Sequence, residues 1–193
     1  MYNTGAEPAK RESLWRESYK TYRTAAALWE KGRKPGMGQI RRAKEKDIPR
    51  ILELLVQVNM VHHRGRPDLF RGPATKFSKE ELQELLRDPE RPVFVWANEE
   101  DEADGYALCL MRETKSDPIL VRHRTLHIDD LCVDETLRGR HIGQALYRHV
   151  LDYAKEAGCY NVTLNVWECN PGARRFYENC GMKPQKTCME TIL

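Results

Sequence analysis

The 193-residue chain contains no apolar run that approaches the roughly 20 residues needed to cross a membrane. Residues 1–15 are polar almost throughout and lack the charged-then-apolar pattern of a secretory leader. With 32% charged and 40% hydrophobic residues, the chain has the composition of an ordinary soluble protein. We therefore expect a cytoplasmic protein that does not bind membranes.

Disulfide, metal and nucleic-acid signals are also missing. The six cysteines include no CxxC pair and lie mostly inside apolar segments, as reduced core residues do, so we expect neither a disulfide framework nor a bound metal. A net charge of +3 is too small to indicate nucleic-acid binding. The basic residues gather at 41–46 and 122–140, which points to local sites instead.

The first 37 residues differ from the rest. Aromatic and small apolar side chains recur there with a 4-3-4-3 spacing, which predicts one amphipathic helix. They are Trp15, Tyr19, Tyr22, Ala26 and Trp29. The Gly- and Pro-rich run at 32–38 would end that helix. We expect a helical extension and linker over 1–37 and one domain over 38–193, with the extension packing on its own domain, pairing with a second copy, or binding another partner.

Strand and helix patterns alternate along the predicted domain. Strands are expected at 39–43, 92–97, 106–111, 124–133, 162–167 and 186–193, with an acidic turn at 98–105. Helices are expected from Ile48, after the Ser78/Glu81 capping box, over 142–157 and over 171–179 with Pro171 in the first turn. This order indicates an α/β (α+β) fold with a mixed, mostly antiparallel sheet of about six to seven strands flanked by helices, and one parallel crossover through the helix at 142–157.

The segment LHIDDLCVDETLRGRHIGQALYRHV is the most informative chemically, because a strand runs through a loop rich in Arg and Gly into a helix. Unpaired N–H groups in the first helical turn and the helix dipole favour anions such as phosphate there. Arg138 and Arg140 add formal charge, while Gly139 and Gly143 allow close approach of backbone to a ligand. Alone, this pattern is compatible with phosphate binding without requiring it.

The run Arg138–Gly143 resembles the pyrophosphate loop of the GNAT acetyltransferases, Gln/Arg-x-x-Gly-x-Gly/Ala. It departs at His141, where the family usually has glycine and a positive φ is expected, although a second register beginning at Arg140 lacks that departure. NVTLNVWECNPGARRFYENCGMKP is similar to the family's later motif, a strand followed by Asn-x-x-Ala-x-x-Phe-Tyr-Glu. The resemblance covers about 39–193, is best from Leu126 onward, and implies the acyl-CoA N-acyltransferase fold.

The resemblance also implies acetyl-CoA as acetyl donor, lying between the strand that ends at Val133 and the next strand, with a backbone bulge freeing N–H groups. Tyr177 would donate a proton to the leaving thiolate. Asn170 would contact the CoA arm, cap the following helix, or do both. The full set of implied CoA-binding residues is Leu131, Cys132, Val133, Arg138, Gly139, Arg140, His141, Ile142, Gly143, Gln144, Ala145, Asn170, Ala173, Phe176 and Tyr177.

Three side chains on the strand 124–133 are candidates for the base that deprotonates the amine. Strand alternation predicts His127 and Asp129 on one face and Asp130 on the other. His127 stands six residues before Val133, where several family members carry a glutamate base, and an imidazole suits neutral pH. All three remain candidates from the sequence.

The acceptor pocket of the family is built largely by the region that corresponds to 61–73. Here Asp68 could hold an ammonium group and Phe70 could wall the acceptor, while Arg66, Arg64 or Arg71 could bind an acidic part. The resemblance thus implies an N-acetyltransferase acting on a primary amine, with a small molecule as the main expectation. A protein or peptide amine is the alternative, and a non-catalytic CoA-binding module is a further one.

Overall fold

The protein is described by a computed structural model that covers residues 38–114 and 118–193. The helix predicted within 1–37 lies outside these residues. The elements are β1 Gln39–Arg42, η1 Glu45–Asp47, α2 Ile48–Gly65, α3 Lys79–Arg87, β2 Val93–Ala97, β3 Ala103–Glu113, β4 Arg124–Val133, η2 Glu135–Leu137, α4 Ile142–Glu156, β5 Asn161–Leu164 and α5 Pro171–Asn179. Their order confirms the predicted alternation as far as α5.

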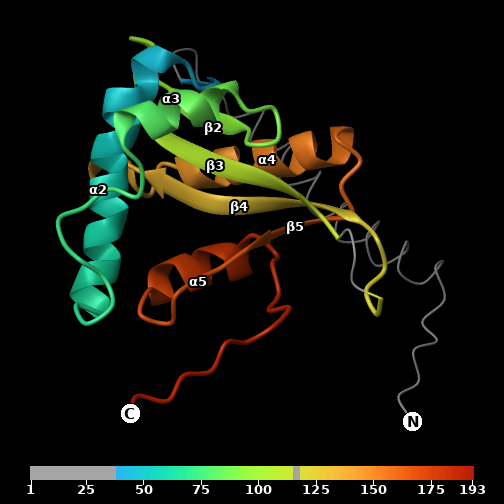
Figure 1. Cartoon of the computed structure of the whole chain (residues 1–193). Helices are drawn as coiled ribbons and strands as arrows, with labels where there is room; N and C mark the ends of the chain where they lie inside the picture. The colour runs from blue at the N-terminus through green and yellow to red at the C-terminus, as the bar shows by residue number, and fades with distance from the viewer. Residues whose placement is uncertain (1–37, 115–117) are drawn as a thin grey trace. The chain divides into compact units, whose positions relative to one another are not determined.

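One five-stranded sheet organises residues Gly38–Cys180, with the strands in the order β1-β2-β3-β4-β5. The first four strands pair antiparallel, and β5 joins β4 in parallel after the crossover through α4 (Figure 1). The mixed α/β fold flanked by helices is therefore confirmed.

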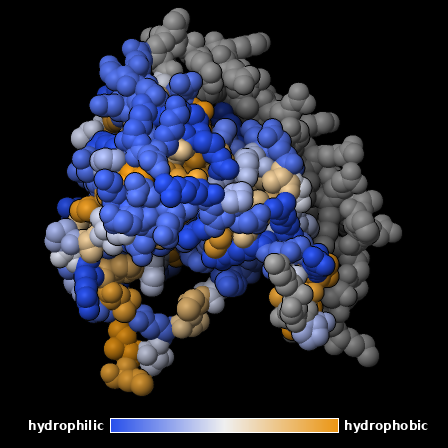
Figure 2. Space-filling view, turned by 45° about the horizontal axis from the view of Figure 1, so that its top comes forward, coloured by the Kyte–Doolittle hydropathy of each residue, from blue (hydrophilic) through white to orange (hydrophobic). Residues whose placement is uncertain are grey.

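Helices cover both faces of the sheet. Val93 and Val95 of β2 belong to a core shared with α2 and α3, whereas Phe94 between them packs edge-on against His149 of α4. Because neighbouring side chains of a strand point to opposite faces, α4 lies opposite α2 and α3 (Figure 1). The face drawn in Figure 2 is mostly hydrophilic, and its larger hydrophobic areas lie on the segments that project at the bottom of the view.

The helix α2 forms because its apolar residues recur at helical spacing, and the structure buries that stripe. Ile48, Ile51, Leu54 and Leu55 are each no more than 2% exposed. Burying one such side chain stabilises the fold by roughly 1.5–3 kcal/mol, so this stripe fixes α2 on the sheet. Ser78 and Glu81 cap α3 reciprocally as predicted. Among the described residues, no helix is both long and apolar enough to cross a membrane.

Several predicted boundaries were wrong. The sheet has five strands instead of six to seven, because residues 186–193 form no strand and their apolar side chains Met189, Ile192 and Leu193 are exposed. The strand expected at 162–167 ends at Leu164. The acidic turn is shorter than expected because Asn98 accepts hydrogen bonds from the amides of Glu100 and Glu102, which lets β3 begin at Ala103.

Candidate functional site

The loop between β4 and α4 has the backbone conformation of an anion site. Gly139 has φ 81° and His141 has φ 63°, the left-handed conformation expected at the position of the missing glycine. The His141 ring lies 2.9 Å from Gln144 Oε1, so the side chain turns along α4. Arg138, Gly139 and Arg140 are all exposed in front of the first turn of α4. The amides of that turn therefore face a basic, solvent-accessible loop.

The start of this loop is held by α2. Asp134 is 5% exposed and accepts hydrogen bonds from the amide and hydroxyl of Thr136. Arg50 and Gln57 of α2 also donate to its carboxylate, and Gln57 accepts from the Glu135 amide. The Thr136 hydrogen bonds and the Arg50 charge hold the pKa of Asp134 well below its usual range. The carboxylate is thus ionised and fixes where the loop leaves β4.

The helix α5 covers the other side of the loop. A side chain at Gly143 would meet the Phe176 ring at 3.4 Å and Val133 at 3.6 Å, so α5 packs closely over the first turn of α4. Asn170 accepts from the Ala173 amide at 3.1 Å and caps α5, which fulfils one of its two predicted roles. Tyr177 contacts the rings of Phe176 and Tyr147, with centroids 5.0 and 6.1 Å away.

The strand β4 has an open edge beside this loop. Its pairing with β5 runs only from Thr125↔Asn161 to Ile128↔Leu164, whereas β4 continues to Val133. Within the described part of the chain, no strand pairs with residues 129–133 on that side. The parallel strands therefore separate where Leu131, Cys132 and Val133 were predicted to meet the pantetheine arm.

A β-bulge interrupts β4 at Asp129. Leu108 pairs with Asp130 and Cys109 with Ile128, so Asp129 has no partner in β3. Leu110 pairs with His127, and because Leu108 and Leu110 share a face, His127 and Asp130 share that face as well. The predicted placement of Asp130 on the face opposite His127 was wrong, since the extra residue resets the alternation. The bulge itself was expected, but near 131–133.

Asp130 is the candidate base with the most unusual environment. Its Oδ2 accepts a hydrogen bond of 3.2 Å from the hydroxyl of Tyr106, a fully buried side chain. Desolvation raises the pKa of Asp130 to about 6. Burial raises the pKa of Tyr177 well above its usual value, and the Asp130 charge raises it further. The carboxyl and the phenol therefore act on each other electrostatically.

The other two candidate bases have different surroundings. His127 is 4% exposed, and its Nδ1 lies 3.0 Å from Thr163 Oγ1 on β5. Asp129 forms an ion pair with Lys76, with Nζ 2.7 Å from Oδ2. The bulge thus brings the Asp129 carboxylate to the segment between α2 and α3, whereas the His127 imidazole lies against Thr163 of β5.

The segment between α2 and α3 contacts the loop after β5. Phe70 packs edge-on against Trp167 with ring centroids 4.9 Å apart, and lies 5.1 Å from the His62 ring. A Cβ at Gly65 would come within 2.7 Å of Cys169, so the backbones approach closely there. Arg66 and Asp68 bind each other at 2.7 Å on the surface. Phe70, one of the three predicted acceptor residues, thus contacts the β5–α5 loop.

Sequence reasoning gave no site role to Lys76, Tyr106 or Trp167. Lys76 and Tyr106 reach the β4 carboxylates across 53 and 24 residues of sequence, so no local pattern could reveal them. Trp167 was placed at the end of a strand, and its half-exposed position before the Asn170 cap became visible only in the structure.

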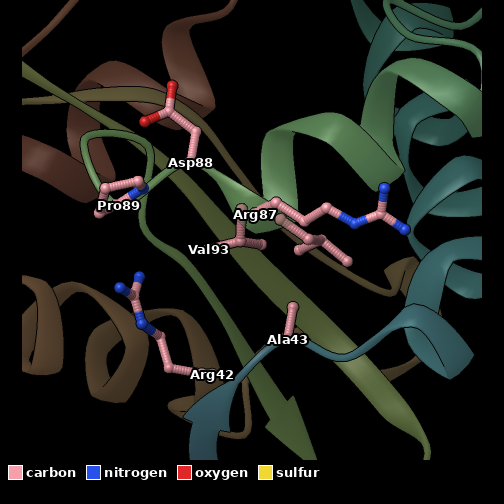
Figure 3. Close-up of a pocket in the computed structure, with 7 residues that line it drawn as sticks. Arg42, Ala43, Arg87, Asp88, Pro89 and Val93 are labelled. Carbon is pink, nitrogen blue, oxygen red and sulfur yellow. The ribbon is translucent and has the colours of Figure 1, made fainter.

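A surface recess of about 260 Å³ lies away from these residues, between β1 and the end of α3. Figure 3 shows that Arg42 and Arg87 extend in different directions and that the Asp88 carboxylate also points away from them. Because its charged groups do not converge, this recess lacks the geometry of a binding site.

Comparisons with known proteins agree with this geometry. The sequence model of the acetyltransferase (GNAT) family matches residues 58–182. A mutant of the BH1408 protein from Bacillus halodurans has a similar structure, with a TM-score of 0.77 and 30% identity over 80% of this chain and 99% of that one.

Two curated relatives carry functional names. A probable glucosamine 6-phosphate N-acetyltransferase 2 from Oryza sativa subsp. japonica is 44% identical over 28% of this chain and 31% of the relative. The peptidyl-lysine N-acetyltransferase YjaB from Escherichia coli (strain K12) is 33% identical over 53% and 58%. The chain spans 31% to 60% of the length of the first curated relatives it matches. The extent of the family match shows that the chain belongs to the GNAT acetyltransferase family.

Proposed function

We propose that the protein is an acetyl-CoA-dependent N-acetyltransferase that transfers acetyl directly to a primary amine of a small molecule. The observation that carries this proposal is the open edge of β4 at 129–133, which includes Asp130 and runs into the left-handed loop before α4. Family membership and the names of the relatives support the same reaction class.

The residues present fit the shape and charge of CoA. Exposed Arg138 and Arg140 and the first amides of α4, from Ile142 to Gln144, would hold the pyrophosphate, whereas the Ala145 amide donates to the His141 carbonyl oxygen. The open edge at 131–133 would pair with the amides of the pantetheine arm, and Asn170, Ala173 and Phe176 would line its other side. When bound, acetyl-CoA supplies the thioester that carries the acetyl group.

The chain's own residues would move two protons. Asp130 is the better placed base, because its carboxyl has a pKa of about 6 and is ionised at neutral pH while remaining a competent proton acceptor. Tyr177 would donate a proton to the leaving thiolate, since its raised pKa keeps the phenol protonated. His127 would then hold β4 against β5, and Asp129 would hold the α2–α3 segment at the acceptor side. Backbone N–H groups of the open edge would stabilise the oxyanion.

A small acceptor is favoured over a peptide by the contact between Phe70 and Trp167 and the close approach of Gly65 to Cys169. These contacts close one side of the acceptor region, whereas a peptide backbone needs an open groove. The lysine-peptide activity in the name of YjaB keeps the peptide as the alternative. A non-catalytic CoA-binding module is disfavoured because Tyr177 and Asp130 are both retained.

The deciding experiment measures free-thiol release from acetyl-CoA against a panel of amines. The panel would contain glucosamine 6-phosphate, polyamines, amino acids and a short lysine peptide. Rapid thiol release with a small amine supports the proposal, and release only with the peptide favours the alternative. Thermal stabilisation by CoA with no turnover on any amine would indicate a binding module.

Charge reversal in the loop tests the CoA site separately. We expect Arg138→Glu to weaken CoA binding by roughly tenfold or more, because a carboxylate would repel the phosphates. The measurement is CoA affinity by calorimetry. Arg112→Glu is the matched control, since Arg112 is exposed at the far end of β3. Equal affinities in the two variants would argue against this loop as the phosphate site.

We infer a cytoplasmic location from the composition, and the aromatic stripe within 1–37 is our candidate for pairing with a second copy.

A further inference from the structure

Lys76 brings a primary amine of the chain itself to the acceptor side of the site. It precedes α3 by three residues, in the segment that also carries Phe70. Its Nζ lies 2.7 Å from Oδ2 of Asp129, and the two side chains are 46% and 25% exposed. The ammonium group is therefore held at the β-bulge while remaining accessible to solvent and to small ligands.

The same amine acts on the candidate base. Desolvation is the main influence on the pKa of Asp130, and the charge of Lys76 is the largest influence that opposes it. Asp129 precedes Leu131 by two residues, which is about 7 Å along a strand. The amine thus lies beside Asp130 and close to the open edge at 131–133.

We propose that Lys76 is an internal acceptor, acetylated by the protein's own active site when no external amine occupies it. This inference rests on the proposed function, because the same acetyl-CoA, base and acid are required. It adds a modification site at a residue that also binds Asp129.

The reaction balances without a further reactant. A bond forms between Lys76 Nζ and the acetyl carbonyl carbon, and the thioester carbon–sulfur bond breaks. Of the three ammonium protons, one stays on the new amide and one passes to Asp130 and then to solvent. Tyr177 protonates the thiolate, and the third ammonium proton then reprotonates Tyr177. The products are acetyl-lysine, CoA with a free thiol, and one proton released to solvent.

Position distinguishes Lys76 from nearby lysines. Lys79, three residues further on, is exposed at the first residue of α3, and Lys46 pairs with Asp101 in the turn before β3. Acetylation of Lys76 would also remove its charge and its ion pair with Asp129. The modified side chain would then occupy the acceptor side as a neutral amide.

The test incubates the full chain with acetyl-CoA labelled in the acetyl group, without any amine, and follows each lysine by tandem mass spectrometry. We expect Lys76 to acquire the label at least tenfold faster than Lys79. Tyr177→Phe should slow labelling of Lys76 by roughly 10²-fold while leaving the slow chemical labelling of Lys79 unchanged. Heat-unfolded protein, in which all lysines are equivalent, sets the chemical background.

Two results would overturn the inference: labelling of Lys76 no faster than that of Lys79, or labelling that is equally fast in Tyr177→Phe. The failure of this inference is separable from that of the proposed function. Thiol release with an added amine while Lys76 stays unlabelled removes only the internal acceptor. Absence of CoA binding and of all turnover would remove both.

Discussion

At the scale of single residues, two ionisable groups on different elements depend on each other. Burial raises the pKa of Tyr177 on α5 and the negative charge of Asp130 on β4 raises it further, while the Tyr106 hydroxyl stabilises the Asp130 carboxylate. A phenol that remains protonated can serve as a proton donor, and a carboxyl with a pKa near 6 can serve as an acceptor. The different environments of Asp130 and Tyr177 therefore suit the first to accept a proton and the second to donate one.

Removing the phenol should separate chemistry from binding. We expect Tyr177→Phe to lower kcat by roughly 10²-fold with CoA affinity nearly unchanged, because the ring contacts remain and only the proton donor is lost. Thiol-release kinetics and calorimetry would measure the two effects. An unaltered kcat would exclude Tyr177 from the mechanism.

The pKa of Asp130 predicts a pH profile. Its value of about 6 lies above the ordinary aspartate value of 3.8, so the active carboxylate is present above pH 6 and is lost as pH falls through 6. We expect kcat/KM to decline about tenfold per pH unit below that point. In Tyr106→Phe the decline should begin at higher pH, since that hydrogen bond lowers the pKa. A profile flat from pH 5 to 8 would contradict Asp130 as base.

Residues also show what sequence alone could establish. The backbone of the loop at Arg138–Gly143 was predictable because it depends on local features, namely glycine, positive φ and a helix start, and His141 has the expected conformation. The bulge at Asp129 was misplaced, because it depends on how β3 and β4 pair across the hairpin. A shift of one residue reverses every side chain beyond it, so the predicted placement of Asp130 on the face opposite His127 failed with it.

At the scale of elements, α2 serves both halves of the site. Arg50 and Gln57 hold Asp134 at the start of the β4–α4 loop, and the far end of α2 meets the β5–α5 loop at Gly65. Because one rigid helix contacts both loops, it fixes the distance between the β4–α4 loop and the β5–α5 loop. In the proposed reaction this distance sets how the acetyl donor and the amine acceptor are positioned. The periodicity of α2 was predictable, but its two polar contacts were not.

The β5–α5 loop is expected to contribute to acceptor binding. Trp167→Ala removes an edge-to-face aromatic contact worth about 0.5–1.5 kcal/mol and opens one wall of the acceptor region. We expect KM for the amine to rise about 2- to 12-fold, with CoA affinity unchanged. Tyr160→Ala is the control, since that exposed aromatic precedes β5 at its other end. Equal effects of the two variants would assign Trp167 no role in the acceptor site.

The strand predicted at 186–193 shows a limit of predicting elements from sequence patterns. Residues 186–193 contain β-prone side chains, but a strand exists only when a neighbour accepts its hydrogen bonds, and no such pairing occurs among the described residues. Helices carry their hydrogen bonds internally, which is why α3 and α5 were predicted closely and the ends of β3 and β5 were not.

At the scale of the whole molecule, the parts of the candidate site all lie within the compact unit Gly38–Cys180. Its N-terminal boundary has a physical basis, because a Cβ at Gly38 would come within 2.2 Å of the Ala97 carbonyl oxygen. Arg41, two residues into β1, pairs with Asp47 at 2.7 Å and with Asp101 at 2.6 Å. The strand β1 therefore belongs to the folded unit, and the boundary predicted near residue 38 is compatible with it.

Truncation tests that boundary directly. A chain that begins at Gly38 should unfold cooperatively, with a Tm within a few degrees of the full chain, and should bind CoA with the same affinity. A chain that begins at Ile48 should lose cooperative unfolding, because it lacks β1, exposes the edge of β2 and leaves Asp101 without Arg41 and Lys46. Calorimetry on both chains measures whether each unfolds cooperatively. If the chain from Gly38 also fails to fold, residues 1–37 are part of the core unit. If it folds, and sedimentation shows that the full chain self-associates while the chain from Gly38 does not, residues 1–37 are an assembly element.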